Sequence, residues 1–295
     1  MLPTNFVKAG GPMETIQEMR EQPATANGRD EGACIQPGGY LLELSLDWIV
    51  CRASENIHHL LGESHVTLID EPLGNFVQAQ ALHDLRNLFS RLSGTTGIAR
   101  AYGVQLTDER DRELHDIAFQ VAKGRVILEA VPSGGDGFGQ AFGSIGGLIA
   151  GLEGSSGDAL LDGAARRMRA LTGYDRVTLF VGERRTESSR GAYSAPAELE
   201  RALPLLIADT EAAGISIFPR EPDDPSVDAA LMKAGDLTSL RDAGVRSAMR
   251  VTFDGGEFRC DSRRLREPSF ERHAAAELFA QMFAMRLEID RLSRR

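Results

Sequence analysis

The sequence predicts an α+β fold with two domains, each built on a central antiparallel sheet with flanking helices. A chain of 295 residues, 42% of them hydrophobic, is long enough to bury two separate cores. Short apolar runs alternate with amphipathic segments, which is typical of mixed sheets with helices between the strands. The densest glycine cluster, residues 132–139, interrupts this pattern near the middle of the chain and indicates a domain boundary.

The first part of the chain predicts an arm followed by two strands. Residues 1–33 combine Gly, Pro, Asn and charged side chains without a sustained period, so we expect an N-terminal arm. Alternating apolar residues over 39–44 predict a strand, and residues 47–51 predict a second one. Residues 53–56 then open a helix that ends before Gly62.

Four further elements complete the first domain, for which we expect the bounds 34–131. They are a helix over 84–92 and strands over 103–106, 115–121 and 125–131. The last of these is almost entirely apolar, so we expect it to close the sheet from a buried position. The glycine-rich residues 132–143 are the expected linker.

The second domain, expected over 144–295, has an amphipathic helix near its start. Asp158 is a candidate N-cap, and Gly173 can end the helix because glycine tolerates a left-handed backbone. The apolar side chains on one face of this helix are Leu160, Leu161, Ala164, Ala165, Met168 and Leu171. A strand is expected directly afterwards, over 174–181.

The C-terminal segment predicts a long helix with a heptad seam. Ser269 is a suitable N-cap, and the helix extends to about residue 292. Apolar residues recur at a four-three-four-three spacing at Leu278, Met282, Met285, Ile289 and Leu292. Phe279 and Phe283 form a neighbouring stripe, so one side can pack on its own domain while the seam meets a second copy. The alternative is an ordinary core helix, because so few heptads are too short for an isolated coiled coil.

Composition and charge argue against several classes of protein. A formal net charge of −10 and a pI near 5.2 disfavour nucleic acid as a direct partner, because phosphates are bound by a concentrated basic surface. Apolar runs are all shorter than the roughly 20 residues that span a bilayer, so we expect a cytoplasmic protein with no membrane partner. Cys34, Cys51 and Cys260 lack the spacing of a disulfide framework or a zinc cluster, so we expect reduced thiols and no metal site.

Two common motifs fail at the same residue. Gly137 and Gly139 are followed by Phe142 where the dinucleotide-binding fingerprint G-x-G-x-x-G needs a third glycine. Phe142 also stands where a nucleophile elbow G-x-S-x-G around Ser144 needs its first glycine. The sequence therefore indicates neither a nucleotide loop nor a serine hydrolase.

Three markers, at residues 35–39, 171–180 and 242–253, together resemble the photosensory module of bacterial phytochromes. The first is IQPGG at 35–39 with the apolar run behind it. The second, LTGYDRVTLF at 171–180, is similar to LTGYDRVMVYRF in that family's GAF domain, and DAGVRSAMRVTF at 242–253 resembles its NMGVRASLSV segment. The resemblance implies a PAS domain over 34–131 and a GAF domain over 144–295. It also implies the family's N-terminal knot and a homodimer formed through GAF-domain helices.

The residues that hold the family's pigment differ in this chain. The resemblance implies that biliverdin is attached through a cysteine well upstream of the IQP element, whereas the first cysteine of this chain is Cys34, directly before Ile35. The second family location corresponds to Gly235. Cys34 is an alternative thiol, although a buried packing role is the plainer interpretation. The resemblance places the D-I-P motif at Ser194-Ala195-Pro196, the pyrrole histidine at Asp236, the C-H-H triplet at Cys260, Asp261 and Ser262, and a propionate-binding arginine at Leu205.

These replacements exchange hydrogen-bond donors for acids. Biliverdin carries two carboxylates, so Asp236 and Asp261 would add negative charge beside an anionic ligand. Like charges in a partly buried pocket repel by about a kcal/mol or more per close pair, which disfavours covalent, phytochrome-type bilin binding. The plainer interpretation is that both acids are solvated or cap helices, and a carboxylate pair for acid-base work or cation binding is a further alternative.

Three functions follow from this resemblance. The leading one is a sensory or regulatory module that has lost the usual covalent bilin site and acts in trans, through a homodimer and an unidentified protein effector. The second keeps biliverdin or haem bound noncovalently in the GAF pocket. The third is an enzyme acting on a tetrapyrrole or a nucleotide with Asp236 or Asp261 as the acid, which no sequence feature favours.

Overall fold

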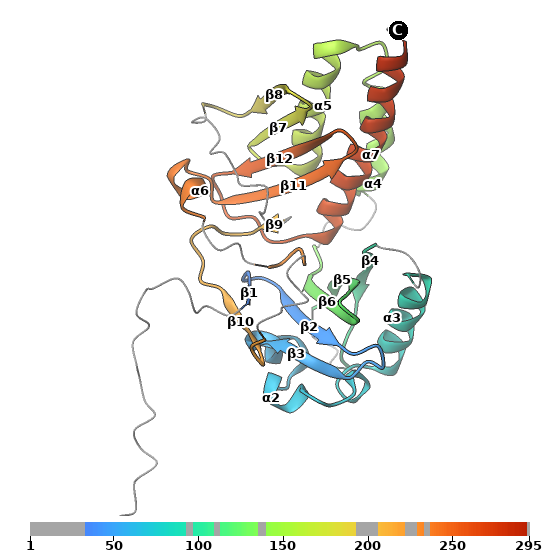
Figure 1. The fold of residues 1–295 in the computed structure, drawn as a ribbon, viewed down its shortest axis with the longest axis vertical. Coiled ribbons are helices and arrows are strands. Elements are labelled where there is room, and N and C mark those ends of the chain that lie inside the picture. The colour runs from blue at the N-terminus through green and yellow to red at the C-terminus, as the bar shows by residue number, and fades with distance from the viewer. Residues whose placement is uncertain are drawn as a thin grey trace, which may run out of the picture. The chain divides into compact units, whose positions relative to one another are not determined.

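Two antiparallel sheets organise the part of the chain that the structure describes (Figure 1). The structure is a computed structural model, and it describes residues 33–92, 97–108, 113–134, 140–192, 206–221, 229–232 and 237–293, with the side chains of 140–142 left aside. Residues 32–295 cluster as one compact unit by their contacts. No helix of these described ranges combines the length and apolarity needed to cross a membrane.

The first sheet has seven strands in the order β1-β10-β3-β2-β6-β5-β4, and neighbouring strands in this order pair antiparallel. The strands are β1 (Cys34–Ile35), β2 (Tyr40–Leu44), β3 (Val50–Ser54), β4 (Ala99–Val104), β5 (His115–Ala122), β6 (Arg125–Pro132) and β10 (Ile215–Phe218). β10 comes from the second half of the chain and lies between β1 and β3. The first sheet therefore includes a strand beyond the range 34–131 expected for its domain.

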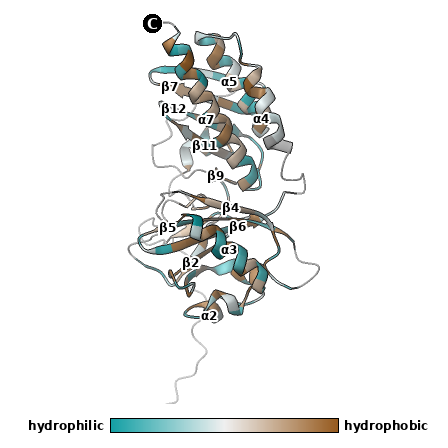
Figure 2. Cartoon of the chain, turned by 90° about the vertical axis from the view of Figure 1, so that its right-hand side faces the viewer, coloured by the Kyte–Doolittle hydropathy of each residue, from teal (hydrophilic) through white to brown (hydrophobic). Residues whose placement is uncertain are grey.

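Short helices and one longer helix cover an apolar core of the first sheet. They are η1 (Glu55–Ile57), α1 (His58–Leu61), α2 (His65–Leu68), η2 (Leu73–Asn75) and α3 (Ala79–Leu92). Leu42, Leu128 and Phe119, from three neighbouring strands, belong to one buried cluster with Ala81 and Leu85 of α3. The hydrophilic residues of α3 are visible in Figure 2, as expected for an amphipathic helix over a core.

The second sheet has five strands in the order β8-β7-β12-β11-β9. They are β7 (Arg176–Val181), β8 (Arg184–Ser189), β9 (Leu206–Ile207), β11 (Ser247–Phe253) and β12 (Gly256–Ser262). The helices are α4 (Gln140–Ala150), α5 (Gly157–Thr172), α6 (Thr238–Asp242) and α7 (Phe270–Leu292). Phe258 of β12 lies 6.1 Å from Phe279 and 5.6 Å from Phe283 between ring centroids, so α7 packs on an aromatic core of this sheet.

Several predicted helices and strands are confirmed, and several begin or end at other residues than the sequence predicted. The strands over 40–44 and 125–131 are present, and Gly173 ends α5 in the left-handed region with φ of 71°. Ser156 rather than Asp158 is the N-cap of α5, because Asp158 lies inside the helix and pairs with Arg184.

Three more bounds differ from the sequence predictions. The second strand runs over Val50–Ser54 instead of 47–51, because Trp48 adopts a positive φ of 65° in the turn before it. The strand expected at 103–106 lies at Ala99–Val104, and α4 begins at Gln140, inside the expected linker. Ser269 caps α7 as predicted, accepting from the backbone N–H of Arg272 at 3.2 Å.

Candidate functional site

The second sheet has one apolar face and one polar face, and the polar face carries the candidate site. Register places Leu179, Phe258 and Val251 side by side on β7, β12 and β11, and all three are buried in the core. One residue along, the row is Thr178, Arg259 and Arg250. Because side chains alternate between the faces of a strand, these polar residues lie on the side opposite the aromatic core.

Arg176 and Asp261 form a buried ion pair on the polar face. They are direct cross-strand partners in β7 and β12, and Oδ2 of Asp261 accepts from Nη2 at 2.7 Å and from Nε at 2.9 Å. The two residues are only 1% and 3% exposed, so the expectation of a solvated or capping Asp261 is wrong. Burial raises the pKa of Asp261, while the charge of Arg176 opposes this shift. The negative charge of Asp261 is therefore compensated within the protein.

Cys260 lies on the opposite side of the sheet from Asp261. It is fully buried in the apolar core, and burial raises the pKa of its thiol far above the ordinary value. Ser262 is also buried, and its hydroxyl donates to Oδ2 of Asp175 at 2.9 Å. Of the three residues matched to the family's triplet, only Asp261 is thus on the polar face with Arg176.

Two buried oxygens of this face have no hydrogen-bond partner. They are Oγ1 of Thr178, in a residue 1% exposed, and Oδ1 of Asp261. A buried oxygen without a donor costs free energy of about 1–3 kcal/mol, so such atoms are usually satisfied by water or a ligand. Both atoms are acceptors for a donor group, although a hydroxyl can also donate.

Other residues expected at the site fall elsewhere or outside the described ranges. Ser194, Pro196 and Asp236 lie outside the described residues, as does Leu205. Cys34 is half-buried in β1, where it faces Ser216 of β10. Within the described residues, no group of three His, Cys, Asp or Glu side chains is placed to hold a metal ion.

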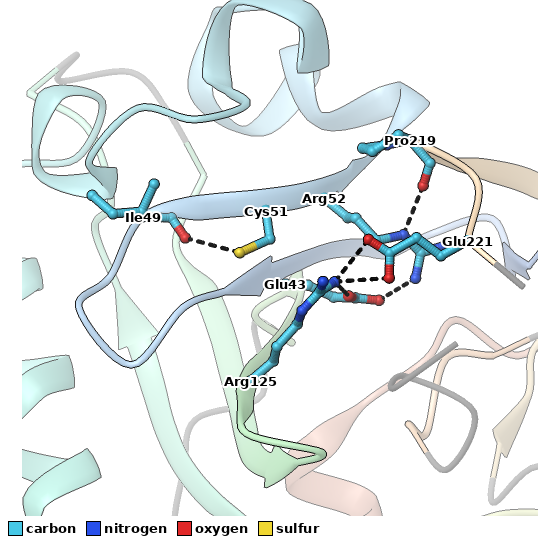
Figure 3. Close-up of polar contacts among 7 residues, drawn as sticks. All are labelled: Glu43, Ile49, Cys51, Arg52, Arg125, Pro219 and Glu221. Carbon is cyan, nitrogen blue, oxygen red and sulfur yellow. Dashed lines mark hydrogen bonds and ion pairs between the residues drawn. The ribbon is translucent and has the colours of Figure 1, made fainter. Parts of the chain in front are cut away.

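A second charged cluster, which sequence reasoning missed, lies on the first sheet (Figure 3). Glu43 and Arg52 are cross-strand partners and fully buried, and they form an ion pair. Nη1 of Arg125 donates to Oε2 of Glu43 at 3.0 Å and to Glu221 at 3.1 Å, while Nε of Arg52 donates to the carbonyl of Pro219 at 2.8 Å. This cluster binds residues 219–221 of the second half to the first sheet. The sequence signal was the pair of opposite charges within two otherwise buried strands.

α7 carries the predicted seam on its exposed side. Met285, Ile289 and Leu292 are 61%, 58% and 57% exposed, and Leu278 is 37% exposed. Met282 instead packs partly against the core that holds Phe279 and Phe283. Beside the seam lies a groove of about 690 Å³, bounded by α7 and two hairpin turns. Its lining includes Val181, Arg184, Asp254, Met285, Glu288 and Arg291.

Comparison with known families places residues 30–132 among PAS folds. Residues 30–132 match the family model PAS_2, described as a PAS fold. No curated protein sequence matches the chain well enough to indicate a relative. The match ends at the last residue of β6 and so contains six of the seven strands of the first sheet.

Solved structures extend the likeness over both halves. The chromophore-binding domain of an unusual bacteriophytochrome from R. palustris is 19% identical, with a TM-score of 0.71 over 90% of this chain and 96% of that one. The wild-type chromophore-binding domain of Stigmatella aurantiaca phytochrome P1 is 20% identical, with a TM-score of 0.67 over 90% and 99%. The phytochrome photosensory core module from S. aurantiaca is 20% identical, with a TM-score of 0.71 over 92% of this chain and 61% of that one. The chain therefore has the PAS–GAF fold of bacteriophytochrome chromophore-binding domains, as the sequence markers predicted.

Proposed function

We propose that this protein is a phytochrome-like sensory or regulatory module that has lost the usual covalent bilin site and does not attach a bilin covalently. It acts in trans, through a homodimer built on α7 and through a protein effector. The observation that carries this proposal is the division of the matched triplet, in which Cys260 is in the core and Asp261 is paired with Arg176. A buried thiol with a strongly raised pKa is a poor nucleophile at neutral pH, so it does not suit pigment attachment.

The ion pair also changes how the site would treat an anionic pigment. Arg176 is committed to Asp261 by two hydrogen bonds, so it is poorly placed to bind a propionate. Asp261 is compensated, so simple charge repulsion is weaker than the sequence alone suggests. The loss of donors, rather than net negative charge, is what disfavours the usual mode of binding.

The unpartnered oxygens support a second candidate function, noncovalent binding of a tetrapyrrole. The solved relatives are chromophore-binding domains, and pyrrole nitrogens are N–H donors that suit buried acceptor oxygens. Thr178 and Asp261 supply such oxygens on the polar face. The described residues of this face in β7, β11 and β12 include no His, Cys or Met, which favours biliverdin over haem.

An acid-base enzyme receives less support from the geometry. Asp261 is held by Arg176 and buried, so it is not poised to exchange protons with a substrate. The functional proposal therefore stays with a sensory or regulatory module.

An absorbance spectrum decides between a pigment-free and a pigment-binding module. The protein is purified after co-expression with biliverdin production, and spectra are taken before and after red illumination and after acid denaturation. We expect no pigment to remain on the acid-denatured protein. Pigment that is retained in acid and lost in Cys34→Ser would contradict the absence of covalent attachment.

If pigment binds noncovalently, its affinity tests the polar face. Thr178→Val removes the unpartnered oxygen while keeping the shape of the side chain, and we expect about a tenfold weaker Kd, as for the loss of one hydrogen bond. The matched control is Thr252→Val, an exposed threonine of β11 at the end of the same face. Equal affinities for the two variants would remove Thr178 from the site.

A further inference from the structure

The outer side of α7 carries an apolar strip near its C-terminal end. Met285, Ile289 and Leu292 share this side because they are four and three positions apart in the helix. Each is more than half exposed, whereas Phe283 on the inner side is fully buried. Single apolar side chains on a surface need no explanation, but three on one side of a helix form a continuous strip. We call these three residues the ridge.

The groove described above runs along the neighbouring side of the same two turns of α7. Ala284, Leu287 and Glu288 line it, and they share a side of the helix because they are three or four positions apart. Its other lining residues come from the turns between β7 and β8 and between β11 and β12. Met285 lines the groove and also belongs to the ridge. The ridge and the groove therefore adjoin on one surface.

The ridge and the groove match in length and in polarity. The ridge covers residues 285–292 and the groove residues 284–291 of α7, so each extends about 10 Å along the helix. Charged groups of both signs line the groove, and Arg184 and Arg291 are already paired with Asp158 and Glu288. A groove whose charges are largely compensated suits an apolar strip better than a strongly charged segment.

A ridge beside a groove suits a symmetric pair of identical chains. In an interface with twofold symmetry both copies present the same patch, so every contact occurs twice. Rotation about a twofold axis that runs along α7 brings two copies face to face, with the ridge of each over the groove of the other. An unrelated partner would have to supply both a groove and a ridge at this spacing, whereas a second copy has both.

We propose that the groove beside α7 receives the ridge of a second copy of this chain, while the ridge of the first copy occupies the groove of the second. The inference rests on the homodimer proposed above, and it specifies which surfaces of the two copies meet. The groove is thereby assigned to an interface between copies rather than to a small ligand.

Two variants each damage one half of this contact. Ala284→Trp fills the groove, because a tryptophan at this lining position takes the space that the ridge needs. Ile289→Glu places a charge on the ridge, where the contact would bury it. A homodimer of either variant has two altered contacts. At about tenfold for each contact, its Kd should be about 100-fold above that of the wild type.

Mixing the two variants distinguishes this contact from any other dimer. In the mixed dimer, the unaltered ridge of the Ala284→Trp chain meets the unaltered groove of the Ile289→Glu chain. One of the two contacts is therefore normal, and we expect a Kd only about tenfold above that of the wild type. Fluorescence-detected sedimentation of one chain labelled at its N-terminus, titrated with the other, measures each Kd. Far-UV circular dichroism checks that both variants are folded.

The controls are the same two changes at exposed positions outside α7. Ala213→Trp and Val66→Glu should keep the Kd of the wild type. A dimer that Ala284→Trp leaves intact, or a mixture that associates no more tightly than the variants alone, would overturn the contact of ridge and groove while the homodimer itself stands. A monomeric wild type would overturn both this contact and the homodimer of the proposed function.

Discussion

Glu43, Glu129 and Asp261 are buried carboxylates that differ in their hydrogen-bond partners. Glu43 lies between Arg52 and Arg125, Glu129 accepts from two backbone amides, and Asp261 is paired with Arg176. Removing one partner of a buried ion pair is strongly destabilising, because the remaining charge is desolvated and no longer compensated by an opposite charge. We therefore expect substitution of either partner in the Glu43–Arg52 and Arg176–Asp261 pairs to destabilise the protein.

We predict that Arg176→Leu destabilises the protein by about 3–5 kcal/mol at neutral pH, because it leaves Asp261 charged and buried. The loss should shrink as the pH falls below the raised pKa of Asp261, since the neutral acid is cheaper to bury. Urea denaturation at several pH values measures both effects.

The control is Arg184→Leu, which breaks the exposed pair with Asp158 and should cost less than about 1 kcal/mol. Equal losses in the two variants, or a loss for Arg176→Leu that grows towards low pH, would contradict this account of Asp261.

α7 is the element that links the core to a second copy in the proposed function. Its inner side packs Phe279 and Phe283, both fully buried, on the second sheet. Its outer side exposes Met285, Ile289 and Leu292 beside the groove. A helix with apolar residues on two sides is typical of one that packs on its own domain and also meets a partner.

At the element scale, we predict that Met285→Glu and Ile289→Glu convert a dimer to a monomer, because each places a charge in an apolar interface. Light scattering coupled to size exclusion measures the mass directly. Val66→Glu, at an apolar position 73% exposed and outside α7, is the matched control and should leave the mass unchanged. A monomeric wild type would contradict the dimer itself.

For the molecule as a whole, buried and partly buried polar contacts connect the two halves of residues 32–295. β10 and residues 219–221 join the first sheet through strand pairing and through the Glu43 cluster. Glu129 and Gln36 hold residues 229–232, and Arg100 pairs with Glu277 of α7. Such contacts make the unfolding of one half costly for the other, so we expect cooperative unfolding.

At this scale, we predict that wild-type unfolding followed by the fluorescence of Trp48, the single tryptophan, coincides with unfolding followed by far-UV circular dichroism. Glu43→Gln should lower the free energy of unfolding by about 3–5 kcal/mol, because it leaves Arg52 charged and buried. Glu288→Gln, in an exposed pair with Arg291, is the control and should cost under about 1 kcal/mol. Separate transitions in the wild type would contradict the cooperative unit.

The fold class and the main regular elements could be predicted from the sequence. Period-two runs such as residues 40–44, the glycine stop at Gly173 and the Ser269 cap depend on neighbours a few residues away, so they can be predicted locally. The three family markers added the order of the two domains, which the solved relatives support. The candidate site was found only in part: Asp261 was identified, but its partner and its burial were not.

The contacts between distant residues could be identified only from the tertiary structure. Arg176 and Asp261 are separated by 85 positions, and Glu129 and Leu231 by 102, so only strand register and loop docking bring them together. Successive side chains of a strand point to opposite faces, so the register of β12 with β7 places Cys260 in the core and Asp261 on the polar face. Local sequence cannot supply that choice, since long-range pairing determines which face is buried.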